Sequence, residues 1–303
     1  MQPVEQAHAF LHKLLQHPPK LPFEPALLPM LFAITREDST ASIRDVTTLI
    51  GRSQKLSARV LALANSAAYG LPAKVSTLHQ AINVLGIREI RLLVLLEGIS
   101  SVISETKLPK SFDIIILWDH QSQVAAIAKA LAAELGSPSG LCGPLATEAN
   151  RLNMAPDEAY VVGFLHDIGK IFFAASRADI WETIEKTWKK GELRYFEAEH
   201  SYWDIDHALI GATVLHYWKL PLLLTEPINW HHAPDLATTY KMEARLLAAA
   251  NHIVHSNFDV ENGLCEEAVA LLPEGIDATA LVIAMTQSLA SASAANLMAP
   301  VRS

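Results

Sequence analysis

The stretch Tyr160 to Lys170 reads Tyr-Val-Val-Gly-Phe-Leu-His-Asp-Ile-Gly-Lys, and the rest of the chain is organised around it. Its first six residues are almost wholly apolar and show no polar face at a strand or helix period, so we expect the segment to be buried on all sides. It carries His166, Asp167 and Lys170 into that apolar surrounding. An unpaired buried carboxylate is costly, so Asp167 needs a cation, a basic partner or several hydrogen-bond donors.

The composition of the whole chain limits its function classes. It has 303 residues, of which 50% are hydrophobic and 18% charged, with a formal net charge of -8. This length fits one large domain or two modest ones. The negative charge argues against direct DNA binding and against an anionic membrane as the main partner. Cys142 and Cys265 have no CxxC spacing, which favours a reducing compartment, so we expect a bacterial-type cytoplasmic protein.

No stretch of the sequence has the pattern of a membrane or targeting segment. Residues 1–20 lack the basic start and apolar run of a signal peptide. The richest apolar run, Ile90 to Ile103, is interrupted by charges and is too short to cross a bilayer. We therefore expect no contact with a membrane.

Apolar residues recur at helical spacing along most of the chain, and strand signals are nearly absent. The sequence therefore predicts an all-α protein. Lys107-Leu-Pro-Lys110 is a plausible boundary, which predicts an N-terminal helical subdomain over 1–108 and a second helical region over 109–303. Helices are expected over 1–20, 27–32, 42–50, 54–65, 77–85, 87–103, 112–135, from 156 onward, and over 180–190, 208–218, 222–232 and 242–256, with one or two more over 266–297. Asp206 can cap the helix at 208–218, and the stretch 137–153, rich in Gly, Pro and Ser, is expected to be a loop or a poorly ordered excursion.

The long helix expected over 112–135 carries a histidine on its apolar side. Its stripe of Leu117, Val124 and Ile127 has His120 within it, so His120 is expected to face inward. A single inward histidine is most simply a satisfied core residue. His120 becomes a candidate site residue because the buried His166-Asp167 pair follows further along the chain.

The histidine and aspartate pattern resembles a known superfamily. His120 followed by His166-Asp167 looks like the H...HD core of the HD superfamily of metal-dependent phosphohydrolases. The segment from Lys55 through Tyr69-Gly-Leu-Pro to Gly86 is similar to the HDOD family, whose members join a helical N-terminal region to an HD-like core. The resemblance covers roughly residues 20–257 and implies that region 109–303 is an HD-like core with C-terminal helices.

In HD enzymes, two imidazoles and two carboxylates hold a divalent ion. The resemblance assigns His120, His166 and Asp167 to the first three ligand positions. The fourth position is usually an aspartate, and here it falls on Asn251, a poorer ligand because it offers a single neutral carbonyl oxygen. This departure argues against efficient hydrolysis. In an active enzyme, Asp167 and Lys170 would be the catalytic residues, with Lys170 contacting phosphate.

Three further histidines resemble the additional ligands of the HD-GYP branch. They are His207, in Asp206-His-Ala-Leu-Ile-Gly-Ala, and the pair His231-His232. With Asp167 as a bridge, they could complete a second metal position. Imidazole-rich ligation suits Fe, Mn, Zn or Ni, so the expected cofactor is one or two divalent transition ions. The Gly-Tyr-Pro of that branch is missing, which argues against hydrolysis of cyclic di-GMP.

Simpler explanations exist for two of these residues. Asp167 could be satisfied by backbone donors near a helix end. Lys170 could be a charge placed near a helix C-terminus. Trp203 and Trp230, which lie next to the predicted site in the sequence, are most simply packing residues.

Together these features predict an HDOD-type signal-transduction protein. Its HD-type pocket would bind metal and serve for sensing or docking, and its N-terminal helices would contact a signalling partner protein. The pocket could also take a nucleotide or phosphate ligand. The alternative is an active metal-dependent phosphohydrolase acting on a nucleotide or another phosphate ester, and a carboxylate in place of Asn251 would have favoured it.

Overall fold

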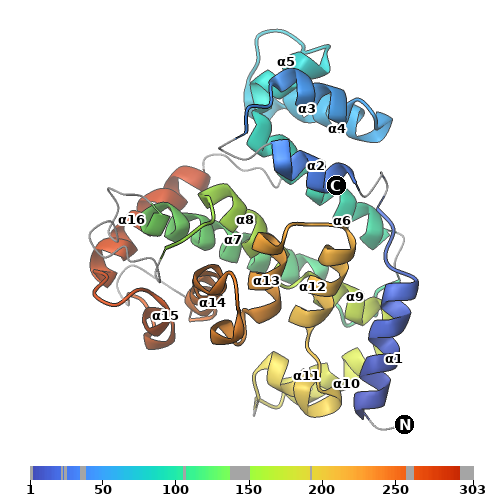
Figure 1. Cartoon of the computed structure of the whole chain (residues 1–303), viewed down its shortest axis with the longest axis vertical. Helices are drawn as coiled ribbons and strands as arrows, with labels where there is room; N and C mark the ends of the chain where they lie inside the picture. The colour runs from blue at the N-terminus through green and yellow to red at the C-terminus, as the bar shows by residue number, and fades with distance from the viewer. Residues whose placement is uncertain are drawn as a thin grey trace. The chain divides into compact units, whose positions relative to one another are not determined.

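The structure is a computed structural model that describes residues 3–21, 23, 26–34, 39–104, 107–136, 151–191, 193–256 and 263–293. Within these ranges every regular element is a helix and no strand is present (Figure 1). The prediction of an all-α fold is therefore confirmed. None of the helices in the described part is long and apolar enough to cross a membrane. The stretch 137–150, most of a loop expected after the long helix, lies outside the described residues.

The chain packs into two compact units. The first comprises residues 1–18, 108–216 and 222–295, and the second comprises residues 19–107, 217–221 and 296–303. The principal division, between Lys107 and Leu108, lies within the proline-containing segment noted above. The assignment of 1–108 and 109–303 to separate domains stays a prediction.

The second unit is a bundle of short helices that begin at polar caps. Ser42, Ser53 and Thr77 each accept a hydrogen bond from a backbone N–H in the first turn of the helix that follows, which satisfies donors that the helix itself cannot. Helix α4 packs against α5 and α6, and α3 packs against α5. The helices are α2 (Leu27–Ile34), α3 (Ile43–Ile50), α4 (Gln54–Ala64), η1 (Ala67–Tyr69), α5 (Leu78–Leu85) and α6 (Ile87–Ser104).

The first unit contains the organising stretch and the remaining helices. Helices α7 and α8 pack along each other, and α14 and α16 pack against α7. The helices are α1 (Pro3–Gln16), α7 (Ile114–Gly136), α8 (Pro156–Leu165), α9 (Ile168–Ser176), α10 (Ala178–Trp188), α11 (Tyr195–Trp203), α12 (His207–Tyr217), α13 (Leu222–Trp230), η4 (Pro234–Leu236), α14 (Lys241–His255), α15 (Glu266–Leu271) and α16 (Ala278–Ser293).

Two glycines allow the close helix contacts that position the buried stretch. A Cβ at Gly163 would lie 2.6 Å from the Cα of Ala125, so α8 lies directly against the backbone of α7. A Cβ at Gly169 would collide with the carbonyl oxygen of His207 and would lie 2.7 Å from the backbone nitrogen of Gly211, so α9 lies directly against α12. These contacts bring the two ends of the organising stretch close to different neighbouring helices.

The organising stretch departs from the expected single helix. It forms two helices, α8 and α9, and His166 and Asp167 occupy the break between them. The burial prediction holds, because the residues from Val161 to Gly169 are all buried. A second difference is α11, which the sequence did not predict. Its buried face consists of Ala198, Glu199 and Trp203, so a carboxylate interrupts the apolar pattern.

Candidate metal centre

Asp167 lies at the middle of the candidate site and is only 1% exposed. Its side chain does not cap α9, so backbone donors do not satisfy it. Instead, its Oδ2 lies 2.6 Å from the Lys170 ammonium and its Oδ1 lies 2.8 Å from His207 Nε2. Burial by itself would raise the pKa of Asp167, but the positive charges of Lys170 and His207 and the hydrogen bond from His207 outweigh it and hold that pKa well below its usual range. Asp167 therefore remains ionised.

Lys170 is in the first turn of α9, so its interpretation as a charge near a helix C-terminus is wrong. Its ammonium group also lies over the ring of Tyr195, 4.9 Å from the centroid. Lys170, which is half-buried, is thus the basic partner that Asp167 required.

The first donor group consists of His120 from α7, His166 and Asp167, whose potential ligand atoms all lie within 4.8 Å of one another. His166 Nε2 lies 3.5 Å from Asp167 Oδ2, and His120 Nε2 lies 3.8 Å from the same oxygen. Two ring nitrogens and one carboxylate oxygen from different helices thus meet at one place.

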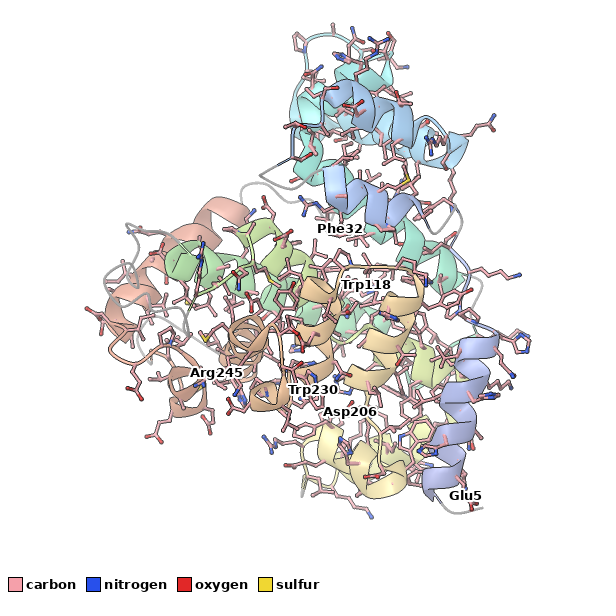
Figure 2. The ribbon with its side chains drawn as sticks, viewed as in Figure 1. Glu5, Phe32, Trp118, Asp206, Trp230 and Arg245 are labelled. Carbon is pink, nitrogen blue, oxygen red and sulfur yellow. The ribbon has the colours of Figure 1, made fainter. Side chains whose placement is uncertain are left out.

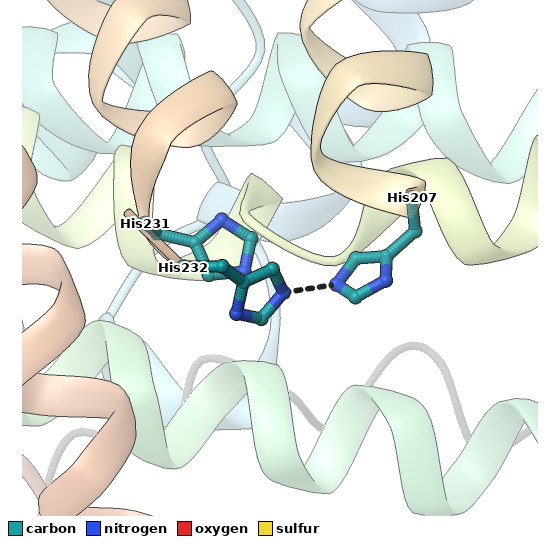
Figure 3. A group of neighbouring side chains, drawn as sticks. All are labelled: His207, His231 and His232. Atoms are coloured by element: carbon teal, nitrogen blue, oxygen red, sulfur yellow. Dashed lines mark hydrogen bonds between the residues drawn. The ribbon is translucent and has the colours of Figure 1, made fainter. Parts of the chain in front are cut away.

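The second donor group consists of His207 at the start of α12 and the pair His231 and His232 after α13 (Figure 3). His232 Nε2 lies 3.0 Å from His207 Nε2, and His231 Nε2 lies 4.0 Å from Asp167 Oδ1. The ring of His232 also stacks on Phe196, with centroids 4.1 Å apart. Asp167 therefore presents one oxygen to each group.

Hydrogen bonds to the backbone orient two of the imidazoles. His166 Nδ1 lies 2.7 Å from the carbonyl oxygen of Gly163, and His231 Nδ1 lies 2.7 Å from that of Ile228. A carbonyl oxygen only accepts, so in both rings Nδ1 carries the proton and donates it. Burial lowers the pKa of His166 well below its usual value and, together with His207, lowers that of His231 to about 4. Both rings are therefore neutral, and Nε2 has a free lone pair.

His207 differs, because both of its nitrogens face carboxylates. Its Nδ1 lies 2.6 Å from Glu199 Oε2, opposite the contact of its Nε2 with Asp167. Burial disfavours the charged ring, but Glu199 and Asp167 outweigh burial and raise the pKa of His207 to about 9. His207 is thus an imidazolium that joins two buried carboxylates.

The turn between α11 and α12 holds His207 in place. Glu199 accepts the backbone N–H of His207, and Asp206 accepts that of Leu209 and so caps α12. Figure 2 labels Asp206, whose other oxygen lies 3.1 Å from His200 Nε2. The sequence predicted the cap but missed Glu199. The only local signal was an acidic residue eight positions before a histidine.

Helix α14 contributes Asn251 and a residue that the sequence did not single out, His255. Asn251 is 9% exposed and lies beside His120. The rings of His120 and His255 lie 4.8 Å apart. His255 as a whole residue is exposed, but its ring is partly desolvated, and this desolvation together with His120 lowers the pKa of His255 to about 4. Residues four apart lie on one helix face, so the spacing from Asn251 was a signal that could have identified His255.

The unpaired atoms at this place fit a cation site. Buried polar atoms normally have hydrogen-bond partners. Here four buried atoms lack one, namely His120 Nε2, His166 Nε2, His231 Nε2 and Asn251 Oδ1. They surround an ionised carboxylate, and imidazole with carboxylate is a donor set for borderline transition ions. The residues present therefore fit a divalent transition ion. The structure brings together every residue that the sequence proposed for the site.

This all-helical fold and its histidine and aspartate cluster define a protein of the HD type. The HDOD domain family matches residues 21–234, so the chain belongs to the HDOD family.

The chain is also similar to individual proteins. An uncharacterized protein of Treponema pallidum (strain Nichols) is 24% identical over 230 residues, which is 75% of this chain and 41% of the relative. The chain thus spans less than half the length of that relative.

Several solved structures are similar, and three of them illustrate the range. One from Shewanella amazonensis, with the provisional name phosphohydrolase, is 25% identical with a TM-score of 0.67 and covers 94% of this chain and 96% of its own. An HDOD domain protein of unknown function from Geobacter sulfurreducens is 21% identical with a TM-score of 0.68. The match covers 97% of this chain and 98% of that protein. One from Marinobacter aquaeolei, provisionally named a signal transduction protein, is 17% identical with a TM-score of 0.74. The match covers 98% of this chain and 65% of that protein. The last two show the fold alone.

Proposed function

We propose that this chain is a signal-transduction protein whose HD-type pocket binds one or two divalent transition ions and serves for sensing or docking. One observation carries the proposal. Three buried imidazole Nε2 atoms without partners lie 3.5 to 4.0 Å from the Asp167 carboxylate. Leaving them without a partner would cost free energy, and an ion would satisfy them together.

The donor set supports binding more than catalysis. Asp167 is the carboxylate shared by the two groups, and its Oδ2 is already paired with Lys170. Asn251 adds a neutral oxygen where a carboxylate would have added charge and a stronger donor. A pocket of this kind can hold an ion and change its local structure when the ion enters or leaves. That is the property a sensing or docking site needs.

A phosphohydrolase is the second candidate. The 25% identical Shewanella structure carries that provisional name. When bound, a divalent ion supplies Lewis acidity toward a phosphoryl group. Asp167 would supply the negative charge that holds the ion. Lys170 would contact the phosphate once its ammonium group leaves Asp167.

Elemental analysis tests metal binding. The protein is purified without chelator or nickel affinity resin, beside Asp167→Ala and the control Asp157→Ala, which changes an aspartate of α8 that pairs with Lys129 at the surface. We expect near-stoichiometric Fe, Mn, Zn or Ni in the wild type and the control, and a sharp fall in Asp167→Ala. Absence of metal from the wild type, including after loading with Zn²⁺ or Mn²⁺, would refute the proposal.

A turnover assay separates the two functions. The metal-loaded protein is incubated with p-nitrophenyl phosphate and with bis(p-nitrophenyl) phosphate. We expect no more release of nitrophenol than from Asp167→Ala. Turnover that disappears in both Asp167→Ala and Lys170→Met would favour the phosphohydrolase.

The proposal for the partner concerns the second unit, whose α4 and α5 are joined by an exposed loop at 70–74. Asn65 fixes this loop at one end, because its side chain donates to the carbonyl oxygen of Val75 and accepts the N–H of Val75. A fixed exposed loop is a suitable contact for a signalling protein. The proposal would be supported if the wild type captures a partner protein and the variant Leu71→Asp, with unchanged helicity, does not.

A further inference from the structure

The first donor group has three donors, and two candidates for a fourth lie on α14. Zinc and similar ions in proteins usually take four ligands, of which at least three come from side chains. His120, His166 and Asp167 supply three. Asn251, beside His120, has a buried oxygen without a partner. An amide oxygen is a poor donor to a borderline transition ion, so the group is incomplete with Asn251 alone.

His255 lies next to this incomplete position. It is one turn beyond Asn251 on the same face of α14. Its ring centroid lies 4.8 Å from that of His120, which itself lies 5.3 Å from that of His166. The three imidazoles thus form a continuous row that begins beside Asp167 and ends at the exposed His255.

We propose that His255 supplies the fourth protein donor to an ion held by His120, His166 and Asp167, in place of the carboxylate that Asn251 lacks. This inference rests on the metal binding proposed above. The resulting set of three imidazoles and one carboxylate prefers Zn²⁺, Co²⁺ or Fe²⁺ to Mg²⁺ or Ca²⁺. His255 is exposed, so it is also the donor of this set that solvent reaches.

Metal affinity provides the first test. Apo-protein is titrated with Zn²⁺ alone in competition with a chromophoric chelator. His255→Ala is compared with His252→Ala, a change on the same helix at a residue whose charged neighbours are Glu267 and Arg194. We expect His255→Ala to weaken Zn²⁺ binding at least about tenfold and His252→Ala to leave it unchanged, since lost metal-site interactions typically cost 10 to 100-fold.

Asn251→Asp provides an independent test, in which one donor is added while another is removed. A carboxylate at 251 would restore a strong donor, so removal of His255 should matter little in that background. We expect the double variant Asn251→Asp with His255→Ala to bind Zn²⁺ about as tightly as the wild type. Circular dichroism of each variant shows whether the helices are retained.

Spectroscopy separates a ligand from a positioning residue. X-ray absorption of the Zn²⁺ form should show one imidazole fewer in His255→Ala than in the wild type. An unchanged imidazole count would overturn the inference and leave His255 as a support for the ring of His120. So would equal Zn²⁺ affinity of His255→Ala and His252→Ala. In either case the proposed function would stand, whereas a wild type that binds no ion would remove both.

Discussion

The two donor groups on either side of Asp167 differ in how far their nitrogens are already engaged. In the first group, His120 Nε2 and His166 Nε2 have no hydrogen-bond partner. In the second, His207 contacts Glu199, Asp167 and His232. An ion entering the second group must displace these hydrogen bonds and a proton, which lowers its affinity. We therefore expect the two groups, although similar in their side chains, to bind an ion with unequal strength.

The largest expected effect comes from removing a donor from each group in turn. His166→Ala should lower the affinity for the tighter Zn²⁺ ion by more than about 100-fold, because even indirect changes at metal sites cost 10 to 100-fold. His232→Ala should affect only a weaker second ion. Calorimetric titration with Zn²⁺ measures both steps, and the exposed His216→Ala is the control on α12. If His166→Ala and His232→Ala lowered the affinity for the tighter ion equally, the two donor groups would not differ in strength.

The next effect tests the helix contact that holds the two groups together. Gly169→Ala places a Cβ against the carbonyl oxygen of His207, so α9 and α12 must separate. We expect a loss of about 1 to 3 kcal/mol in the free energy of unfolding and weaker Zn²⁺ binding. Urea unfolding measures the first quantity.

The matched control for this contact is Gly136→Ala on α7. Its added Cβ would lie no closer than 3.9 Å to its nearest neighbour, the side chain of Leu152. It should be neutral or slightly stabilising. If both variants have the same stability, α9 and α12 are not held as closely as described.

A smaller effect concerns the cation already present in the first group. Lys170 places its ammonium 2.6 Å from Asp167 Oδ2, the oxygen nearest His120 and His166. Lys170→Met should strengthen Zn²⁺ binding roughly tenfold, because it removes a like charge at short range. Lys129→Met, which breaks the pair with Asp157, is the control. Weaker binding in Lys170→Met would mean that the lysine organises Asp167 rather than competing with the ion.

The smallest effect separates the stability of the fold from the chemistry of the site. Glu226, on the helix that precedes His231, accepts the backbone N–H groups of Thr238, Thr239 and Tyr240. Burial would raise the pKa of Glu226, but these hydrogen bonds outweigh it and lower that pKa. Glu226→Gln should cost about 1 to 2 kcal/mol at neutral pH without changing Zn²⁺ affinity.

The pH dependence of this cost follows from the lowered pKa of Glu226. Its contribution is present above the unfolded value, near 4.3, and is lost as the pH falls through the lower folded value. Thermal unfolding of the wild type and Glu226→Gln from pH 7 to pH 3 should therefore converge at the acid end. A difference that widens as the pH falls would contradict this sign.

Most helices were predictable because their signals are local. Thr77 accepts the N–H of Gln80 at the start of α5, and the apolar stripe around His120 became α7. Both features depend on residues within a few positions of each other. The same cannot be said of α11, because its inward residue Glu199 is polar and breaks the pattern that identifies a buried face.

The order of residues along the chain was enough to propose an all-α fold and the histidines and aspartate of the site. It could not indicate that the buried stretch breaks at Asp167, or that Lys170 and His207 would take its two oxygens. Nor could it single out Glu199 and His255. These facts depend on contacts between helices far apart in the sequence, including the close backbone contacts at Gly163 and Gly169. Local periodicity carries no information about such distances, so the partners of each nitrogen depend on how the helices pack.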